Sequence, residues 1–254
     1  YEMIGCLVGS EMCIRDRAEV AAAGADLGIG FDGDGDRIGI IDGKGRQVPG
    51  DLLTAFLAKD VAARHPGAPI LLDVKSSEAA LRLVESAGAA AQIWKTGHSH
   101  MKKRMKELEA PLAGEMSGHI FIADNYLGFD DAIYAAVRVI TQMVKGGQSI
   151  TEFMDSLPKQ HATPELRIDC PDTVKFDSME RIRAHVLSGH DAADVNSIDG
   201  VRVRSGDGWW LIRASNTEAA LVARAEAADR TALDRLLGNI ETTLAAAGLD
   251  WKRP

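Results

Sequence analysis

Hydrophobic and polar residues are arranged so that short apolar runs alternate with amphipathic stretches over most of the chain. The short runs, bounded by turn residues, predict strands at 27–31, 37–42, 70–74, 90–95 and 118–124. The longer stretches predict helices at 49–65, 76–88, 98–110, 130–147 and 149–157, with 18–25 as the end of another helix. We expect the run 27–31 to be a buried strand. The alternation predicts right-handed βαβ units and a parallel sheet.

A different pattern follows residues 158–164, where two prolines among polar residues indicate a domain boundary. Strands are predicted beyond it at 165–170, 200–205, 208–215 and 220–226, followed by an amphipathic helix at 231–249. The expected fold class is therefore α/β, with βαβ units in a mixed α/β region followed by a smaller α+β C-terminal domain.

The first 17 residues differ from the rest of the chain. They hold two of the three cysteines, Cys6 and Cys13, and show neither helical nor strand periodicity. An irregular arm and a non-native segment remain alternatives for 1–17. We assign no functional residue there.

Composition narrows the class of protein. Of 254 residues, 46% are hydrophobic and 26% are charged, which is typical of a globular protein. The net charge of −8 argues against a nucleic-acid partner or an anionic-membrane surface, so any anion must be bound by focused groups. Scattered cysteines, no apolar run of roughly 18–20 residues and no leader pattern predict a cytoplasmic protein without a membrane span.

The sequence Asp-Gly-Asp-Gly-Asp-Arg at 32–37 places three carboxylates at alternating positions after an apolar strand. Glycines permit a curled loop, and three hard oxygen donors suit Mg²⁺ or Ca²⁺. An EF-hand is excluded, because Arg37 and Gly43 occupy the positions that require Gly and Glu. A polar turn with solvated carboxylates is the alternative, although like charges crowd together at a cost without a cation. Arg37 is either a charge-balancing residue or a phosphate clamp.

The segment 114–119 offers a carboxylate, a hydroxyl and an imidazole between two glycines, as Glu115, Ser117 and His119. Such a loop can hydrogen-bond sugar hydroxyls and position a histidine for proton transfer. A capped turn, in which Glu115 and Ser117 satisfy backbone amides, is the alternative.

The segment 213–218 supplies a guanidinium, hydroxyls, an amide and backbone N–H groups at the end of a predicted strand. This combination suits a phosphate, which arginine can bind through two charged hydrogen bonds. The alternative is a helix N-cap at Ser215 or Thr217. Lys75 and His98 each follow a predicted strand, where ligands approach open α/β sheets, although single residues there are often ordinary surface.

Six segments together resemble the α-D-phosphohexomutase superfamily, and in particular bacterial phosphomannomutase/phosphoglucomutase. They are, in order, GFDGDGDR, DVKSS, WKTGHS, GEMSGH, GFDDAIY and RASNTE. The resemblance covers approximately residues 18–254. Members of the family move a phosphoryl group between O1 and O6 of a hexose through a phosphoserine and a bisphosphate intermediate.

The resemblance implies roles for the acidic loop and the histidine. Asp32, Asp34 and Asp36 match the family's Mg²⁺ ligands, and Arg37 matches the adjoining arginine. His119 matches a candidate proton-transfer group.

The resemblance also implies contacts with a phosphosugar. Glu115 and Ser117 match residues that contact sugar hydroxyls, and Lys75 and His98 match cleft residues near substrate. The family's phosphate-binding loop is matched by Arg213, Ser215, Asn216 and Thr217. The implied ligands are glucose or mannose 1- or 6-phosphate and the bisphosphate intermediate, bound by a protein that is a monomer at full length. Met116 is similar to the phosphomannomutase/phosphoglucomutase branch, because the phosphoglucosamine branch usually carries Gln there.

The chain departs from the family at the nucleophile, because it contains no T-[AG]-S-H-N-P type loop. We therefore expect a C-terminal fragment without domain 1 and most of domain 2, inactive as a mutase on its own. Its expected parts are the arm 1–17, the end of domain 2 at 18–46, domain 3 at 47–157 and domain 4 at 158–254. A phosphoglucosamine mutase and a non-catalytic phosphosugar-binding module remain alternatives. A Mg²⁺-dependent phosphatase is disfavoured, because it explains neither GEMSGH nor RASNTE.

Overall fold

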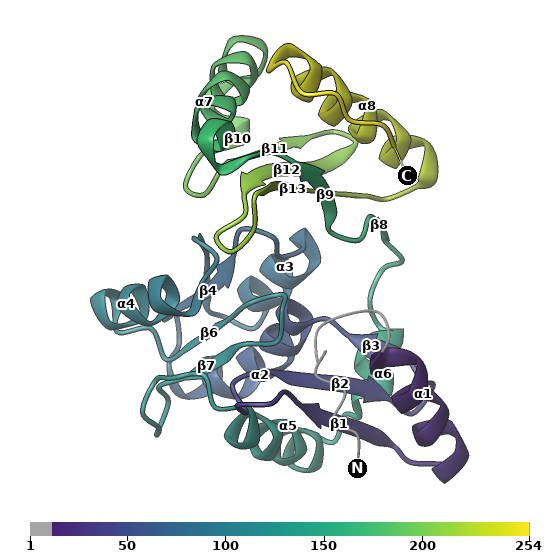
Figure 1. Ribbon diagram of the computed structural model, residues 1–254. Helices are drawn as coiled ribbons and strands as arrows, with labels where there is room; N and C mark the ends of the chain where they lie inside the picture. Colours follow the sequence, from purple (N-terminus) through teal and green to yellow (C-terminus); the bar gives the residue numbers. More distant parts are fainter. Residues whose placement is uncertain (1–11, 254) are drawn as a thin grey trace. The chain divides into compact units, whose positions relative to one another are not determined.

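The computed structural model describes residues 12–253, with side chains from residue 17 onward (Figure 1). These residues form two compact units. Unit 1 ends at Pro158 and unit 2 begins at Lys159. Each unit has a hydrophobic core of its own, so each is described separately.

Unit 1 begins with helix α1 (Met12–Ala23) and a three-stranded antiparallel sheet. The strands are β1 (Leu27–Phe31), β2 (Ile38–Asp42) and β3 (Gln47–Val48), in the order β1-β2-β3. The register pairs Phe31 with Ile38, so the loop 32–37 closes a hairpin. The six residues of the predicted metal loop, three of which are aspartates, therefore form the tip of a β-hairpin.

Two sequence predictions fail in this region. Helix α1 begins inside the segment predicted to be irregular, so that prediction is wrong from Met12 on, while residues 1–11 lie outside the described part. Strand β1 is not buried as predicted, because most of its residues are half-buried and Phe31 is 38% exposed. The physical reason is that, among the described residues, only β2 pairs with β1.

A four-stranded mixed sheet forms the centre of unit 1. Its strands, in spatial order, are β5 (Ala90–Trp94), β4 (Pro69–Asp73), β6 (Leu112–Gly114) and β7 (Ile120–Ile122). Strand β4 is parallel to β5 and β6, and helices α3 (Glu78–Ser86) and α4 (His98–Leu108) lie in the connections. This confirms the predicted βαβ units. Strand β7 is antiparallel to β6, so the sheet is mixed and not purely parallel.

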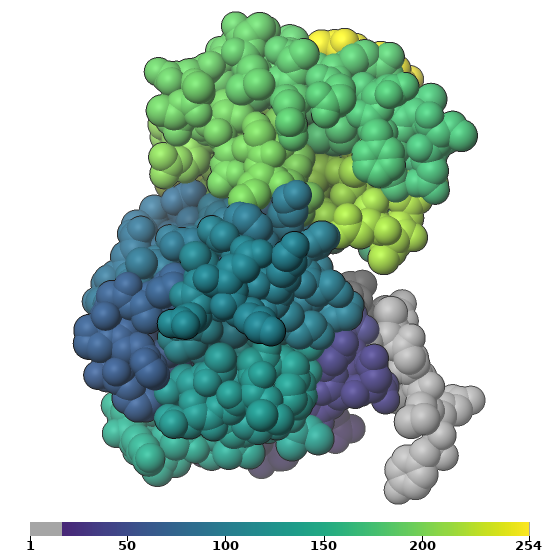
Figure 2. All heavy atoms as spheres, turned by 90° about the vertical axis from the view of Figure 1, so that its left-hand side faces the viewer, coloured from purple at the N-terminus to yellow at the C-terminus, as the bar shows by residue number. Residues whose placement is uncertain are grey.

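Three further helices complete unit 1: α2 (Gly50–Arg64), α5 (Ala132–Gly146) and α6 (Ile150–Asp155). Leu53 and Phe56 of α2 are almost fully buried in the core. Local capping fixes where helices begin, since the Asp131 side chain accepts from the amide of Tyr134 and Ser149 forms a capping box with Glu152. In Figure 2 the segments from about residue 70 to 150, coloured blue to teal, form one closely packed body.

Unit 2 is an antiparallel sheet with two helices on one face (Figure 1). The strands are β8 (His161–Ala162), β9 (Leu166–Asp169), β10 (Val195–Asn196), β11 (Val201–Ser205), β12 (Gly208–Ala214) and β13 (Ala220–Ala227). The order is β10-β11-β12-β13-β8, and β9 also pairs with β13. Unit 2 therefore has the predicted α+β class.

Helices α7 (Asp172–Gly189) and α8 (Arg230–Ala246) bury their apolar side chains against this sheet, and a short 3₁₀ helix spans Ala192–Asp194. The sequence predicted α8 and missed α7. Its buried residues Met179, Ile182 and Val186 have helical spacing, but polar residues surround them. No helix in the described part of the chain is long and apolar enough to cross a membrane.

Close packing between α2 and β6 generates a stability prediction. A Cβ on Gly114 would lie 1.8 Å from Thr54 Oγ1, which is buried and donates to the carbonyl of Gly50 at 2.7 Å. We expect Gly114→Ala to lower the free energy of unfolding of unit 1 by about 1–3 kcal/mol. Gly146→Ala in α5 is the control, because only the flexible Gln142 side chain approaches that position. Hydrogen exchange of β4 and β6 amides measures both, and equal protection in the two variants would contradict the prediction.

Candidate functional site

Asp32 shapes the loop at the tip of the β1–β2 hairpin. Its Oδ1 accepts hydrogen bonds from the backbone amides of Gly35, Asp36 and Arg37, each at 3.1 Å. Gly35 has a φ of +74°, a conformation that glycine adopts without steric cost. The loop therefore curls around one carboxylate, as its glycines allow.

The curl brings the three alternating carboxylates together. Asp32, Asp34 and Asp36 each offer an oxygen, and these oxygens lie within 4.8 Å of one another. Burial raises the pKa of Asp36, and the neighbouring charges of Asp32 and Asp34 raise it further. Burial acts the same way on Asp32, but hydrogen bonds from the Arg37 side chain and backbone hold its pKa below the ordinary value. A hard divalent cation suits this oxygen set and would relieve its repulsion.

Arg37 is an ion-pair partner within the loop. Its Nε lies 2.5 Å from Asp32 Oδ2 and 3.7 Å from Asp36 Oδ1. The side chain remains 36% exposed. It therefore balances loop charge while part of its side chain stays accessible.

The β6–β7 hairpin brings the segment 114–119 against the acidic loop. Arg37 and His119 form an antiparallel bridge, and the amide of Ile38 donates to the carbonyl of Gly118 at 3.1 Å. Gly118 has a φ of +99°, and a Cβ there would lie 2.5 Å from the carbonyl oxygen of Ile38. Glycine at this position thus allows the two hairpins to meet.

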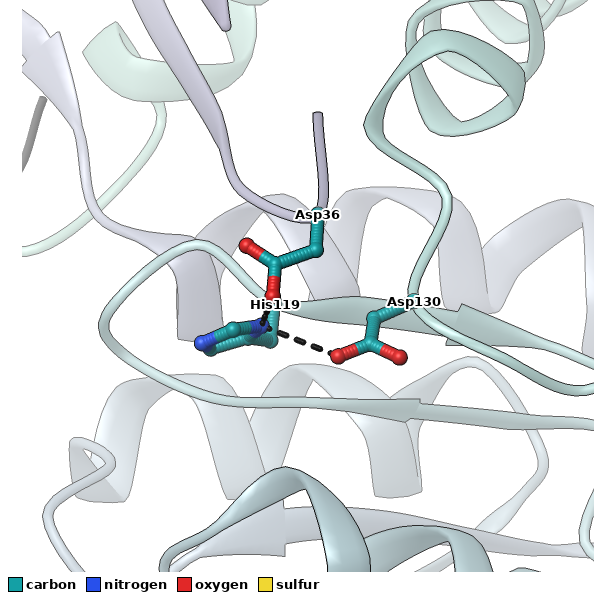
Figure 3. Close-up of side chains that lie close together, drawn as sticks. All are labelled: Asp36, His119 and Asp130. Carbon is teal, nitrogen blue, oxygen red and sulfur yellow. Dashed lines mark hydrogen bonds and ion pairs between the residues drawn. The ribbon is translucent and has the colours of Figure 1, made fainter. Parts of the chain in front are cut away.

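His119 faces carboxylates from two directions (Figure 3). Its Nδ1 lies 3.1 Å from Asp130 Oδ2 and 3.8 Å from Asp36 Oδ2, while the other ring nitrogen points away from both. Burial lowers the pKa of His119, although the two carboxylates oppose this. Asp130 is also bound by Lys102 at 3.0 Å. Asp36, His119 and Asp130 form a second group with potential metal-ligating atoms within 4.8 Å of one another.

Glu115 is buried beside a second aspartate. It is 3% exposed, and its Oε1 accepts from the amide of Gly97 at 2.9 Å while Oε2 accepts from Ser117 Oγ at 3.3 Å. Burial, followed by the charge of Asp73, raises the pKa of Glu115 to about 7. This carboxyl can therefore exist in both protonation states near neutral pH and can donate or accept a hydrogen bond.

Lys75 and His98 lie in the loops that follow β4 and β5. Lys75 is buried, with Nζ 4.0 Å from Asp73 Oδ2, and its charge counteracts the rise in the Glu115 pKa. His98 begins α4, has a half-exposed ring, and lies with Nδ1 3.9 Å from Asp130 Oδ2. Its ring is stacked with that of His119 at a centroid separation of 6.1 Å. In unit 1 the candidate residues therefore lie in the loops that follow β4, β5 and β6 and at the tip of the β1–β2 hairpin.

The predicted phosphate loop lies in unit 2, between strands β12 and β13. No helix begins at Ser215 or Thr217, so the N-cap alternative is wrong. Ser215 Oγ instead accepts from the amide of Glu218 at 3.1 Å, and Lys175 Nζ donates to the carbonyls of Ser215 and Glu218. The loop between the two strands is therefore held in shape by its own hydroxyl and by a buried lysine.

Accessibility differs among the four residues of that loop. Asn216 and Thr217 are exposed, whereas Ser215 and Arg213 are buried. Arg213 Nε donates to Asp199 Oδ2 at 3.0 Å, which orients the guanidinium. The loop can thus offer two exposed polar side chains beside an oriented arginine.

Sequence reasoning assigned no role to five residues whose side chains the structure places in contact with the candidates: Asp73, Lys102, Asp130, Lys175 and Asp199. Asp73 and Asp130 were inside the motifs DVKSS and GFDDAIY, so the motifs marked their segments but not their contacts. Lys102 and Lys175 lie on helices, where nothing in the local pattern distinguishes them from solvated lysines. These contacts depend on which elements are neighbours in space.

The raised pKa of Glu115 predicts a pH dependence of stability. In the folded state the Glu115 carboxyl keeps its proton up to about pH 7, whereas its ordinary pKa is 4.5. The protonated carboxyl therefore contributes fully to the stability of the fold below pH 4.5, and this contribution is lost as pH rises through about 7. We expect Glu115→Gln to abolish the part of the pH-dependent loss of stability that comes from this carboxyl. Denaturant unfolding over this pH range measures it, with exposed Glu85→Gln as the control. A wild-type-to-variant difference that is constant with pH would contradict the assignment.

Comparison with known proteins gives matches of one kind. The phosphoglucomutase/phosphomannomutase alpha/beta/alpha domain III model matches residues 49–161, and the C-terminal domain model of that family matches 165–242. A phosphomannomutase/phosphoglucomutase of Pseudomonas putida is 44% identical over 227 residues, covering 89% of this chain and 49% of the relative. The Pseudomonas aeruginosa counterpart is 41% identical over 219 residues, covering 86% and 47%.

Comparison with solved structures gives matches of the same kind. A phosphoglucomutase/phosphomannomutase family protein of Burkholderia thailandensis has a TM-score of 0.87 and 35% identity, covering 96% of this chain and 52% of that one. An Aspergillus fumigatus N-acetylphosphoglucosamine mutase, in complex with GlcNAc-6P and magnesium, shares the fold with a TM-score of 0.61 at 16% identity, covering 87% and 48%. The chain spans about half the length of the curated relatives it matches.

Two consecutive domain models of one family together match most of the chain, and the relatives and the structures carry the same family description. The chain therefore belongs to the phosphoglucomutase/phosphomannomutase family, of which it contains domain III and the C-terminal domain.

Proposed function

We propose that the natural protein containing this chain is a Mg²⁺-dependent phosphohexomutase, which moves a phosphoryl group between O1 and O6 of glucose or mannose phosphate. The observation that carries the proposal is the junction of two hairpin tips, at which the carboxylate loop and the Glu115 to His119 loop meet through Ile38 and Gly118. One site can thereby hold a cation and a sugar hydroxyl together. The names of the relatives support the same activity.

The residues of the acidic loop fit magnesium. Converging oxygens of Asp32, Asp34 and Asp36 are the hard donors that Mg²⁺ prefers. The bound ion would supply positive charge beside the transferring phosphoryl group. Arg37 stays beside the ligands and orients Asp32 through its 2.5 Å contact.

His119 is proposed to move the proton of the reacting hydroxyl. Asp130 binds Nδ1, which orients the ring and leaves the other nitrogen for the substrate. In the proposed transfer, the P–O bond of a phosphoserine breaks and the released serine oxygen takes up a proton from water, while a P–O bond to the sugar oxygen forms and the hydroxyl proton passes to His119. The 254 residues contain no phosphoserine loop of the family type, so the proposed reaction needs that serine from outside them.

Binding of the sugar is proposed to rest on four residues of unit 1. Glu115 and Ser117 would hydrogen-bond ring hydroxyls, since the partly protonated Glu115 can both donate and accept. Lys75 and His98 would contact the same ligand from the neighbouring loops. A phosphosugar is thus the proposed partner, in a protein proposed to be cytoplasmic and, at full length, monomeric.

The loop of unit 2 is proposed to bind the phosphate that does not react. Arg213 can offer a charged fork, and the exposed Asn216 and Thr217 can add hydrogen bonds. Lys175 donates hydrogen bonds to two carbonyls of the loop. The backbone amides of the loop are therefore held in place before any ligand binds. A non-catalytic phosphosugar-binding module remains the second candidate, and an in-frame phosphoserine loop upstream in the gene would exclude it.

The metal assignment predicts loss of Mg²⁺ affinity in Asp34→Asn. Asp34 is exposed at the loop, so its replacement removes a ligand with little effect on the hairpin. We expect affinity to fall about tenfold or more in calorimetric titration of the 254-residue chain with MgCl₂. Asp26→Asn, an exposed aspartate before β1, is the control. Equal affinity in the two variants would contradict the assignment.

The phosphate assignment predicts that Arg213→Lys weakens glucose 1-phosphate binding about tenfold. Lysine keeps the charge but loses the planar fork that binds two phosphate oxygens. NMR titration of the Ser215 and Thr217 amides measures the change. Arg230→Lys, on an arginine whose side chain is 77% exposed on α8, is the control and should bind like the wild type. No shift of these amides in the wild type would refute the phosphate site.

A further inference from the structure

Asp73 joins three loops that carry the candidate sugar-binding residues. It is the last residue of β4, its side chain is fully buried, and β4 lies between β5 and β6. The parallel register pairs Asp73 with Trp94 and Leu72 with Gly114, so the three strands end side by side. The loops that follow therefore begin around the Asp73 carboxylate.

Both carboxylate oxygens accept hydrogen bonds from those loops. Oδ1 accepts from Ser76 Oγ at 2.8 Å in the β4–α3 loop and from the amide of Met116 at 3.2 Å in the β6–β7 loop. Oδ2 accepts from Thr96 Oγ1 at 3.1 Å in the β5–α4 loop and lies 4.0 Å from Lys75 Nζ. One acceptor-only group thus ties donors from three separate connections.

The residues that Asp73 binds lie within two positions of every candidate sugar-binding residue of unit 1. Lys75 neighbours Ser76, Thr96 precedes His98 by two residues, and Met116 lies between Glu115 and Ser117. Glu115 adds a second tie, because its Oε1 accepts from the amide of Gly97. A shift at Asp73 would therefore move all three loops at once.

We infer that Asp73 is a positioning residue, which holds the Lys75, His98 and Glu115 loops in the arrangement that binds a hexose phosphate. The inference rests on the proposed function for its ligand, though not for the loop geometry. Asp73 is fully buried and so acts through its neighbours and not on the substrate. Misplacing a substrate-positioning group by about 1 Å can lower activity by a factor of 10². Loops that are held in place before the ligand binds can therefore offset the free-energy cost of burying the Asp73 carboxylate.

Asp42 provides a matched control. It is also a fully buried aspartate at the end of a strand, where it accepts from the amides of Lys44 and Arg46. The β2–β3 turn that it holds carries no candidate residue. Any general effect of replacing such an aspartate should thus appear in Asp42→Asn as well.

The test compares Asp73→Ala and Asp73→Asn with Asp42→Asn in the 254-residue chain. Without ligand, we expect amide exchange at Ser76, Gly97 and Met116 to accelerate about tenfold or more in Asp73→Ala, and less in Asp73→Asn. The strand amides of β4 should keep their protection. Unchanged exchange in all three loops would overturn the inference.

Binding supplies the second measurement. Glucose 1-phosphate affinity should fall about tenfold or more in Asp73→Ala, whereas inorganic phosphate, held by unit 2, should bind as in the wild type. A matching loss in Asp42→Asn would overturn the inference. If the wild type binds no glucose 1-phosphate, the proposed function fails, and loop exchange still decides the role of Asp73.

A further signature separates this role from general destabilisation. Removing the Asp73 charge should lower the pKa of Glu115 from about 7, as followed by the ¹³C shift of its carboxyl in Asp73→Asn. If Asp73→Ala fails to fold, Thr96→Val removes one donor and keeps the carboxylate, and its exchange at Gly97 is measured against the same expectation. An unchanged Glu115 pKa together with normal loop exchange would refute the inference.

Discussion

The contact between Ile38 and Gly118 is the constraint on which the candidate site in unit 1 depends. One backbone hydrogen bond joins the first residue of β2 to the loop before β7, and glycine is required because a Cβ on Gly118 would lie 2.5 Å from the carbonyl oxygen of Ile38. Each hairpin alone offers an incomplete set of groups, namely carboxylates in one and a Glu-Ser-His set in the other. Their close approach makes a single environment in which His119 lies 3.8 Å from Asp36.

That environment concentrates negative charge, and each carboxylate is relieved differently. Asp32 has Arg37, Asp130 has Lys102, and Asp73 has the hydroxyls and the amide of three loops. For Glu115, burial followed by the charge of Asp73 outweighs its hydrogen bonds, so its pKa rises to about 7. The overall charge of −8 is therefore compatible with an anionic ligand, because lysines and arginines are placed locally.

Predictions from the sequence were most accurate where a pattern was long or a motif was local. The predicted strand 27–31 has the bounds of β1, and the helices at 49–65 and 130–147 correspond to α2 and α5. Strand β6 was missed, because its three residues are too few to show a period of two. Helix α7 was missed although Met179, Ile182 and Val186 have helical spacing. The half-buried state of β1 depends on its neighbours and has no local signal.

The amino-acid sequence by itself determined most of the elements, the loops between them and the chemical groups that those loops carry, because spacing, caps and glycines act over a few residues. Only the tertiary structure decided that β4 lies between β5 and β6, and hence that Asp73 receives hydrogen bonds from three loops. It also decided the pKa of Glu115, since burial and the charge of Asp73 are imposed by residues distant in the chain. Strand order and burial arise from packing between distant segments, which no local pattern encodes.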